Sequence, residues 1–100
     1  MKEYALKMRV GAWIDIDVVY DFLVEIDENA AHKELTKILA RIEGLKFFPK
    51  TGSPVIISTE GILRQVNVSS YRILYVVHDE ESFVEVHGIE HMKQKSRFID

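Results

Sequence analysis

The segment from Tyr71 to His78 constrains the fold more than any other part of the chain. Its residues are rich in β-branched and aromatic types, which favour a β-strand. Successive side chains of a strand point to opposite faces of a sheet, and apolar residues occupy both alternating sets here. A strand that is apolar on both sides is typical of the interior of a sheet. The pattern therefore predicts a central strand.

Three further strands are predicted in the same half of the chain. They cover residues 55–58, 63–68 and 83–90, and short polar breaks such as Glu60-Gly61 and Ser69-Ser70 separate them. Breaks of this length join antiparallel neighbours. The second half of the chain therefore predicts an antiparallel meander.

The first half begins with a strand and a helix. Residues 4–10 alternate apolar and polar side chains, as a half-buried strand does, and Gly11 is expected to end this strand. Apolar residues then recur at helical spacing over residues 18–26, with Asp15 or Asp17 as the expected N-cap.

A second helix is predicted over residues 30–45, where apolar residues again follow the three-four spacing and Gly44 stands at the expected end. The order of elements predicts an α+β fold: an N-terminal strand, a helical hairpin packed on one face of a sheet, a meander of three to four antiparallel strands, and a short C-terminal tail. The length of 100 residues, without a shift in composition, predicts a single domain over residues 1–100.

The composition excludes several classes of protein. The chain contains no Cys, which excludes disulfide scaffolds, Cys-ligated zinc and thiol nucleophiles. Nothing near Met1 resembles a signal peptide and no apolar run is long enough to span a bilayer, so a cytoplasmic protein without membrane contact is expected. The net charge of −3 supplies no overall cationic field to attract nucleic acid.

From Leu45 onward the sequence resembles the RelE/ParE toxin superfamily. Residues 45–52 resemble its L-x₃-P-x₂-G turn, and Leu63-Arg64 resembles the L-R opening of its next strand. Residues 71–75 are similar to its Y-R-I-L-Y strand. Residues 86–94 are similar to its V-x₂-I-x-H-x-R-Q ending, with Lys93 in place of the usual arginine.

The resemblance implies the growth-inhibiting toxin of a type II toxin–antitoxin pair, as in plasmid stabilization systems, with a cognate antitoxin as partner and no cofactor. The turn and strand motifs resemble the ParE branch more closely, so the leading hypothesis is a non-enzymatic inhibitor of DNA gyrase. The alternative is a RelE-like, ribosome-dependent mRNA endonuclease. A third hypothesis is an inactive superfamily member that serves as a binding module.

If the chain is a ribonuclease, three residues are its catalytic candidates. Cleavage of RNA needs a cation beside the phosphate, a base and an acid. The resemblance assigns the phosphate contact to Arg72, with Arg64 near the same site and His91 as the titratable group. We expect Arg72 and His91 to converge on one face of the sheet. The resemblance also implies that ribonucleases of the family often carry an arginine just beyond the last strand and a tyrosine in the tail. Met92 and Phe98 fall at those two places, and neither can transfer a proton.

Each candidate also has a purely structural interpretation. Arg72 could pair with Glu85 or Glu90 of the next strand. Arg64 could be an edge arginine that improves solubility, and His91 a structural histidine. The sequence alone leaves both interpretations open.

The alternation of the last strand places His87 on the same face as Ile89 and His91. Two histidines alone make a poor metal site, because a zinc site uses three or four protein ligands. No metal site is predicted.

Four residues are candidates for binding a partner. Lys33, Lys37 and Arg41 recur every four residues as a basic ridge, which is either a solvated face or a landing site for an acidic antitoxin segment or a nucleic-acid backbone. Trp13, expected between the first strand and the first helix, either packs locally or anchors a partner. Residues 15–28 carry several acidic side chains and no Lys or Arg.

We also expect an apolar antitoxin groove beside the hairpin or along a sheet edge, through which the free chain forms homodimers.

Overall fold

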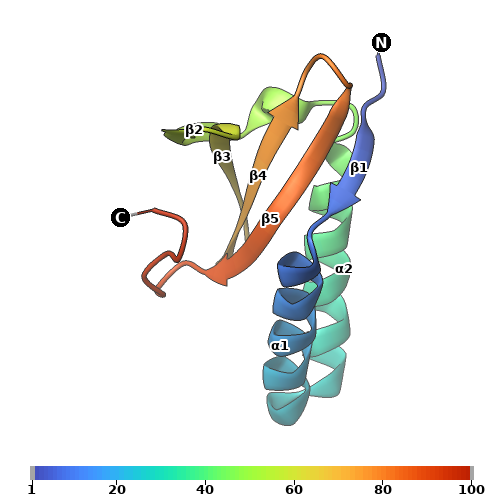
Figure 1. The fold of residues 1–100 in the computed structure, drawn as a ribbon. Coiled ribbons are helices and arrows are strands. Elements are labelled where there is room, and N and C mark those ends of the chain that lie inside the picture. The colour runs from blue at the N-terminus through green and yellow to red at the C-terminus, as the bar shows by residue number, and fades with distance from the viewer. Residues whose placement is uncertain (1, 100) are drawn as a thin grey trace.

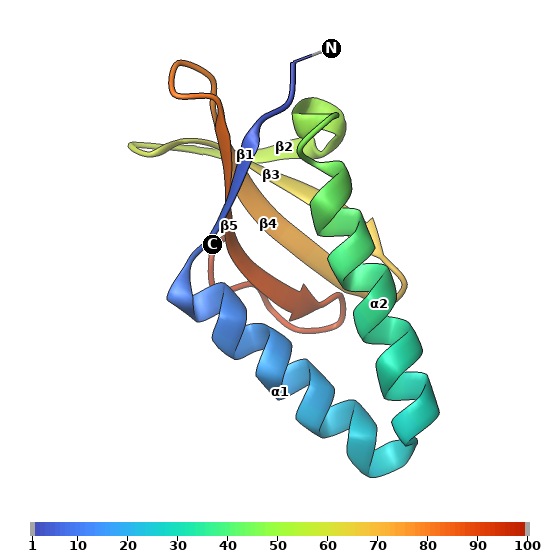
Figure 2. The same cartoon turned by 90° about the vertical axis from the view of Figure 1, so that its right-hand side faces the viewer.

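The computed structural model describes residues 2–99 and contains one five-stranded sheet with a helical hairpin on one face (Figures 1 and 2). The elements in chain order are β1 (Ala5–Met8), α1 (Val10–Ile26), α2 (Glu28–Gly44), the 3-10 turn η1 (Pro49–Thr51), β2 (Ser53–Ser58), β3 (Gly61–Val68), β4 (Tyr71–His78) and β5 (Phe83–His91). The predicted α+β order of strand, helical hairpin and meander is confirmed.

The sheet is mixed, with the strand order β1-β5-β4-β3-β2. β1 lies beside β5 and runs parallel to it, with Leu6 opposite Val84. The other neighbouring strands are antiparallel. β4 lies in the middle of the sheet, as its apolar pattern on both faces predicted.

Helix α1 begins earlier than expected. β1 ends at Met8, and the backbone N–H groups of Ala12 and Trp13 donate to the carbonyl of Arg9, so the helix begins at Val10. Gly11 therefore lies inside the helix and does not follow the end of a strand. Asp15 and Asp17 are likewise helical residues, and the N-cap is Arg9 and not either of them.

Asp27 joins the two helices. Its backbone N–H donates to the carbonyl of Leu23 at the end of α1. Its side-chain Oδ1 accepts hydrogen bonds from the backbone of Asn29 at 2.9 Å and of Ala30 at 3.3 Å, which caps the start of α2. Asn29, expected between the helices, is therefore the second residue of α2. The hairpin extends past the end of the sheet in both views (Figures 1 and 2).

Apolar clusters lie on both faces of the sheet. The larger one fills the space between the sheet and the helices and includes Ile73 and Tyr75 of β4. The smaller one, on the other face, includes Leu74 and Val76 and is covered by Phe98 of the C-terminal tail. The expected alternation of β4 is confirmed, because its two sets of side chains enter different clusters.

A bulge in β5 reverses the alternation that the sequence predicted. The register between β4 and β5 shifts by one residue at His87. Val86 and Ile89 therefore both belong to the helix-side cluster, although they are three residues apart. His87 lies beside Phe98 on the other face. The expectation that His87, Ile89 and His91 share one face is wrong.

Candidate functional site

Arg72 holds the C-terminal tail against the sheet. Its Nε donates to Glu90 Oε1 at 3.1 Å, its Nη1 donates to the carbonyl of Met92 at 3.1 Å, and its Nη2 donates to the carbonyl of Gln94. Arg72 is only 9% exposed and Glu90 2%. All three guanidinium nitrogens are engaged within the chain.

Glu90 lies between two guanidinium groups. Its Oε1 accepts from Arg72, and its Oε2 accepts from both the backbone N–H and the Nε of Arg97 at 2.9 Å. Burial alone would raise the pKa of the Glu90 carboxyl, but hydrogen bonds from Arg97, Ser96 and Arg72 outweigh it and lower the pKa below its ordinary value. Glu90 is therefore an ionised, buried anchor for the tail.

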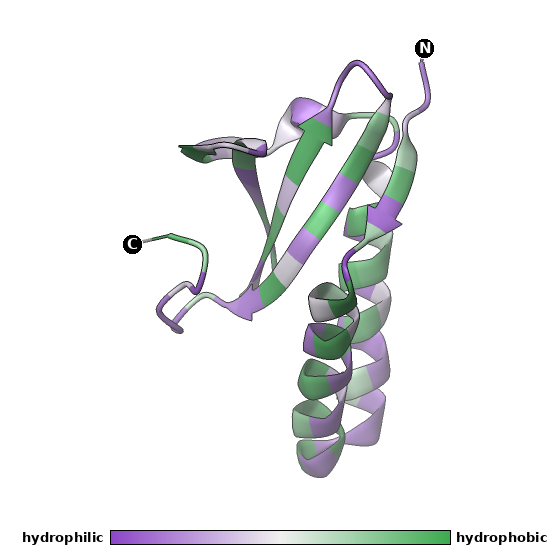
Figure 3. Cartoon of the chain, viewed as in Figure 1, coloured by the Kyte–Doolittle hydropathy of each residue, from purple (hydrophilic) through white to green (hydrophobic). Residues whose placement is uncertain are grey.

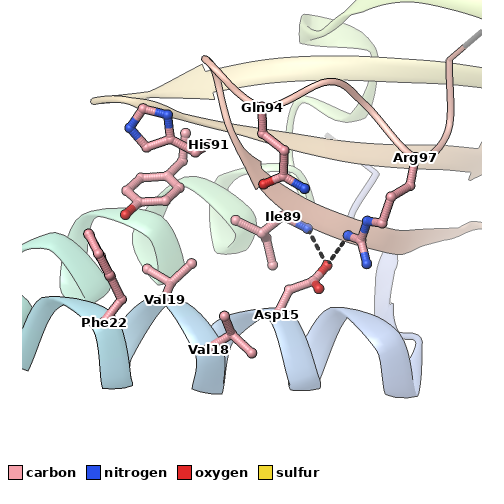
Figure 4. A pocket seen from close by; sticks show the side chains of 9 residues that line it. Asp15, Val18, Val19, Phe22, Ile89, His91, Gln94 and Arg97 are labelled. Atoms are coloured by element: carbon pink, nitrogen blue, oxygen red, sulfur yellow. Dashed lines mark hydrogen bonds and ion pairs between the residues drawn. The ribbon is translucent and has the colours of Figure 1, made fainter.

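Asp15 connects helix α1 to this anchor. Its Oδ2 accepts from Arg97 Nη2 at 2.7 Å and from the backbone N–H of Ile89 at 2.9 Å (Figure 4). The N–H of Ile89 lies beyond the last residue of β5 that pairs with β1, so a side chain takes the place of a strand partner. One carboxylate thus links α1, β5 and the tail.

A groove of about 450 Å³ lies between α1 and this end of the sheet (Figure 4). Its apolar walls include Val18 and Phe22 of α1 and Tyr71 and Ile89 of the strands. Its polar edge includes Arg97 of the tail. A concave, mostly apolar site with a few polar groups suits the apolar side chains of a partner. An apolar groove therefore lies beside the helical hairpin, which is one of the two places where the sequence predicted one.

Helix α1 also carries an exposed apolar ridge, which leads into this groove. The ridge consists of residues four apart that are each more than half exposed: Val10, Ile14, Val18, Phe22 and Ile26. In Figure 3 much of α1 is coloured as hydrophobic. A contiguous exposed apolar surface such as this ridge marks an interaction site.

Within residues 2–99, none of the helices combines the length and the hydropathy that a membrane span requires.

The structure does not bring Arg72 and His91 together, and the expected convergence is wrong. Strand pairing sets Arg72 opposite Glu90 and Tyr71 opposite His91. Cross-strand partners share a face, and neighbours along a strand do not. His91 therefore lies on the helix side with its ring edge-on to Tyr71 at 5.2 Å, whereas Arg72 lies under the tail. The structural interpretation of Arg72, pairing with Glu90, is confirmed.

Arg64 lies apart from both of these residues. It sits opposite Tyr75 on the helix-side face, and its Nη1 donates to the carbonyl of Gly52 at 2.9 Å. None of the three catalytic candidates shares a site with another. A common phosphate-binding centre made of these residues is therefore absent from the described part of the chain.

The predicted partner-binding residues divide between the two helices. Lys33 and Lys37 are exposed on α2, Arg41 is half-buried, and none of them forms an ion pair with another residue from 2 to 99. Trp13 lies within α1, not between a strand and a helix, and is 53% exposed. The predicted position of Trp13 between the first strand and the first helix is wrong because α1 already begins at Val10.

The sequence interpretation missed a second polar cluster under the sheet. Glu85 Oε1 lies 3.2 Å from His78 Nε2 and 3.1 Å from His87 Nε2, and its Oε2 lies 3.4 Å from Arg9 Nε. Burial lowers the pKa of His87 more than the hydrogen bond to Glu85 raises it. No group of three or more metal-ligating side chains within residues 2–99 could hold a metal ion. Glu85 and His87 are two residues apart in β5, and Glu85 pairs with Val76, two residues from His78, so ordinary strand alternation places the three side chains on one face.

Comparison with known proteins assigns the fold. The family described as "ParE toxin of type II toxin-antitoxin system, parDE" matches residues 6–96. A solved structure of the chromosomal ParDE TA system from P. aeruginosa is similar, with a TM-score of 0.72 and 17% identity over 91% of this chain and 98% of that one. The toxin-antitoxin complex RelBE2 from Mycobacterium tuberculosis is similar with a TM-score of 0.55 and 21% identity, over 91% and 93%. No curated protein sequence matches the chain.

Proposed function

The chain belongs to the ParE toxin family of type II toxin–antitoxin systems, and from this membership we propose that it inhibits growth in the cytoplasm by acting on DNA gyrase. We propose further that a cognate antitoxin neutralises it. The observation that carries the choice of target is the engagement of Arg72: its three guanidinium nitrogens bind Glu90 and the tail, so none is directed toward a phosphate.

Two features disfavour the alternative, an mRNA endonuclease. A ribonuclease of this type places a cation, a base and an acid around one phosphate. Arg72 and His91 lie on opposite faces of the sheet. Phe98, at the position of the family's tail tyrosine, packs into the second apolar cluster and carries no proton to transfer. The geometry supports inhibition by binding and not by cleavage.

The groove and the apolar ridge of α1 support the proposal of an antitoxin partner. Ridge residues such as Val10, which is 75% exposed, are costly to leave in water when they lie in one continuous row. An amphipathic segment that lies along α1 would cover them. The groove beside Val18 and Phe22 would receive its apolar side chains.

The test is expression of the chain alone and together with a candidate cognate antitoxin. We expect growth arrest, an induced DNA damage response and intact mRNA when the chain is expressed alone, and rescue by coexpression. Purified chain should inhibit supercoiling by gyrase but leave relaxation by a type I topoisomerase unchanged. Ribosomal A-site cuts in mRNA without a damage response would contradict the proposal and favour the endonuclease.

A further inference from the structure

We propose that the segment that covers α1 is a cationic amphipathic helix. The proposed function supplies the source of this segment, the cognate antitoxin. The charge and apolar pattern of α1 supply its chemistry. The same surface could not accept an acidic segment without placing like charges together.

An acidic row runs beside the apolar ridge of α1. Asp17, Asp21 and Glu25 each directly precede a ridge residue in the sequence, and all three are exposed. They form no ion pair with any residue from 2 to 99. The helix contains no Lys or Arg between Val10 and Ile26 to offset them. The ridge is therefore bordered by unpaired negative charge over its last three residues, Val18, Phe22 and Ile26.

The residues of the ridge are spaced so that a partner helix can pack against α1. Residues four apart form the rows that interdigitate when two helices pack. The 17 residues of α1 span roughly 25 Å at ~1.5 Å per residue, which is the length of several turns of a partner. Val18 and Phe22 belong to both the ridge and the groove (Figure 4). A partner helix seated here has its apolar face over the groove and one polar flank over the acidic row.

Charge distinguishes a cationic helix from the other partners that an apolar surface could bind. A second copy that pairs α1 with α1 places two acidic rows side by side, which is unfavourable. Nucleic acid and an anionic membrane surface are repelled by the same row. Lys or Arg on the flank of a peptide helix pairs with Asp17, Asp21 and Glu25 while its apolar side chains cover the ridge. The observations on α1 therefore favour a cationic helix.

The test uses the purified full chain and three labelled synthetic peptides. Two of them share an apolar row at helical spacing and differ only in carrying Lys or Glu on its flanks. The third has the composition of the Lys peptide in scrambled order. Fluorescence anisotropy at two salt concentrations measures the affinity of each peptide.

We expect the Lys peptide to bind more tightly than the Glu peptide by roughly threefold or more, because each of three exposed ion pairs contributes roughly 1.4- to fivefold. The preference should shrink at high salt. It should disappear in the triple variant D17N/D21N/E25Q. The matched control E3Q/E80Q/E81Q removes the same number of exposed acidic charges away from α1 and should keep the preference.

Several outcomes would overturn the proposal. They are equal or tighter binding of the Glu peptide, equal binding of the scrambled peptide, and an unchanged preference in D17N/D21N/E25Q. A stable dimer of the free chain that Phe22→Ser dissociates would assign the surface to a second copy. The assay does not depend on gyrase or on toxicity. Loss of gyrase inhibition with the peptide preference intact would therefore reject the proposed function and leave the charge inference standing.

Discussion

Arg72 and Glu90 face each other across β4 and β5, with Arg72 Nε 3.1 Å from Glu90 Oε1, and both side chains are almost completely buried. The arginine that the family resemblance marked as a phosphate contact is thus the donor that closes the tail over the sheet. Glu90 remains charged there because Arg97 and Arg72 both bind it. This pair is one of the contacts that hold the tail, and it removes Arg72 from solvent.

Arg72→Ala should destabilise the fold by about 2–4 kcal/mol, because it leaves a buried carboxylate with only one of its two guanidinium partners. Urea denaturation followed by the fluorescence of Trp13 measures the loss. Arg64→Ala is the matched control, since it removes an arginine with one hydrogen bond to a backbone carbonyl. Its cost should be about 1 kcal/mol. Equal losses in the two variants would contradict the assignment of Arg72 as the tail anchor.

The stability of the chain should fall in acid through Glu90. The pKa of Glu90 is lowered from 4.5 in the folded chain, so the unfolded chain binds a proton at higher pH than the folded chain does. The contribution is therefore fully present above pH 4.5 and is lost as the pH falls through the folded pKa. In Glu90→Gln this acid dependence should be weaker in denaturation series from pH 3 to 7. Glu81→Gln, at an exposed position, should retain it.

Gly52→Ala should destabilise the chain by roughly 2–3 kcal/mol through overpacking. A Cβ at this position would lie 2.5 Å from the Tyr75 hydroxyl and 2.8 Å from the carbonyl oxygen of Gln65, and the backbone atom cannot move aside cheaply. The change would also disturb the 2.8 Å hydrogen bond from the Gly52 N–H to that hydroxyl. Gly11→Ala, in α1 with open space around it, should be neutral or stabilising by up to about 1 kcal/mol. Thermal melts of the two variants should therefore shift in different directions or by clearly different amounts.

The sequence predicted the elements well because each has a local signature. The two-sided apolar pattern of β4 and the three-four spacing of α2 depend only on neighbouring residues. The pairing of β1 with β5 could not be predicted, because a strand of four residues has too little pattern to choose a neighbour. The periodicity of the sequence could not identify the protein family, whereas the family motifs did.

The site was predicted less well because its contacts join residues that are far apart in the sequence or depend on the bulge in β5. Asp15 and Ile89 are 74 residues apart, so nothing near Asp15 indicates that its carboxylate binds a strand. The expected convergence of Arg72 and His91 failed on strand register, since neighbouring pairs of residues face opposite sides. The placement of His87 failed because one inserted residue reverses the alternation that carried the prediction.

The purified chain should not cleave mRNA efficiently on ribosomes. Its net charge of −3 provides little cationic surface to offset phosphate repulsion. Arg72 is bound to Glu90, and Met92 and Phe98 cannot stabilise a developing charge. The loss of one such group typically costs ~10²–10³ in rate, so several missing groups leave very little activity. Primer extension on translated mRNA, with a ribosome-dependent RelE-type endonuclease as positive control, measures this. Strong A-site cuts that disappear in Arg72→Ala or His91→Ala would show that the tail opens on the ribosome and that the chain is a nuclease.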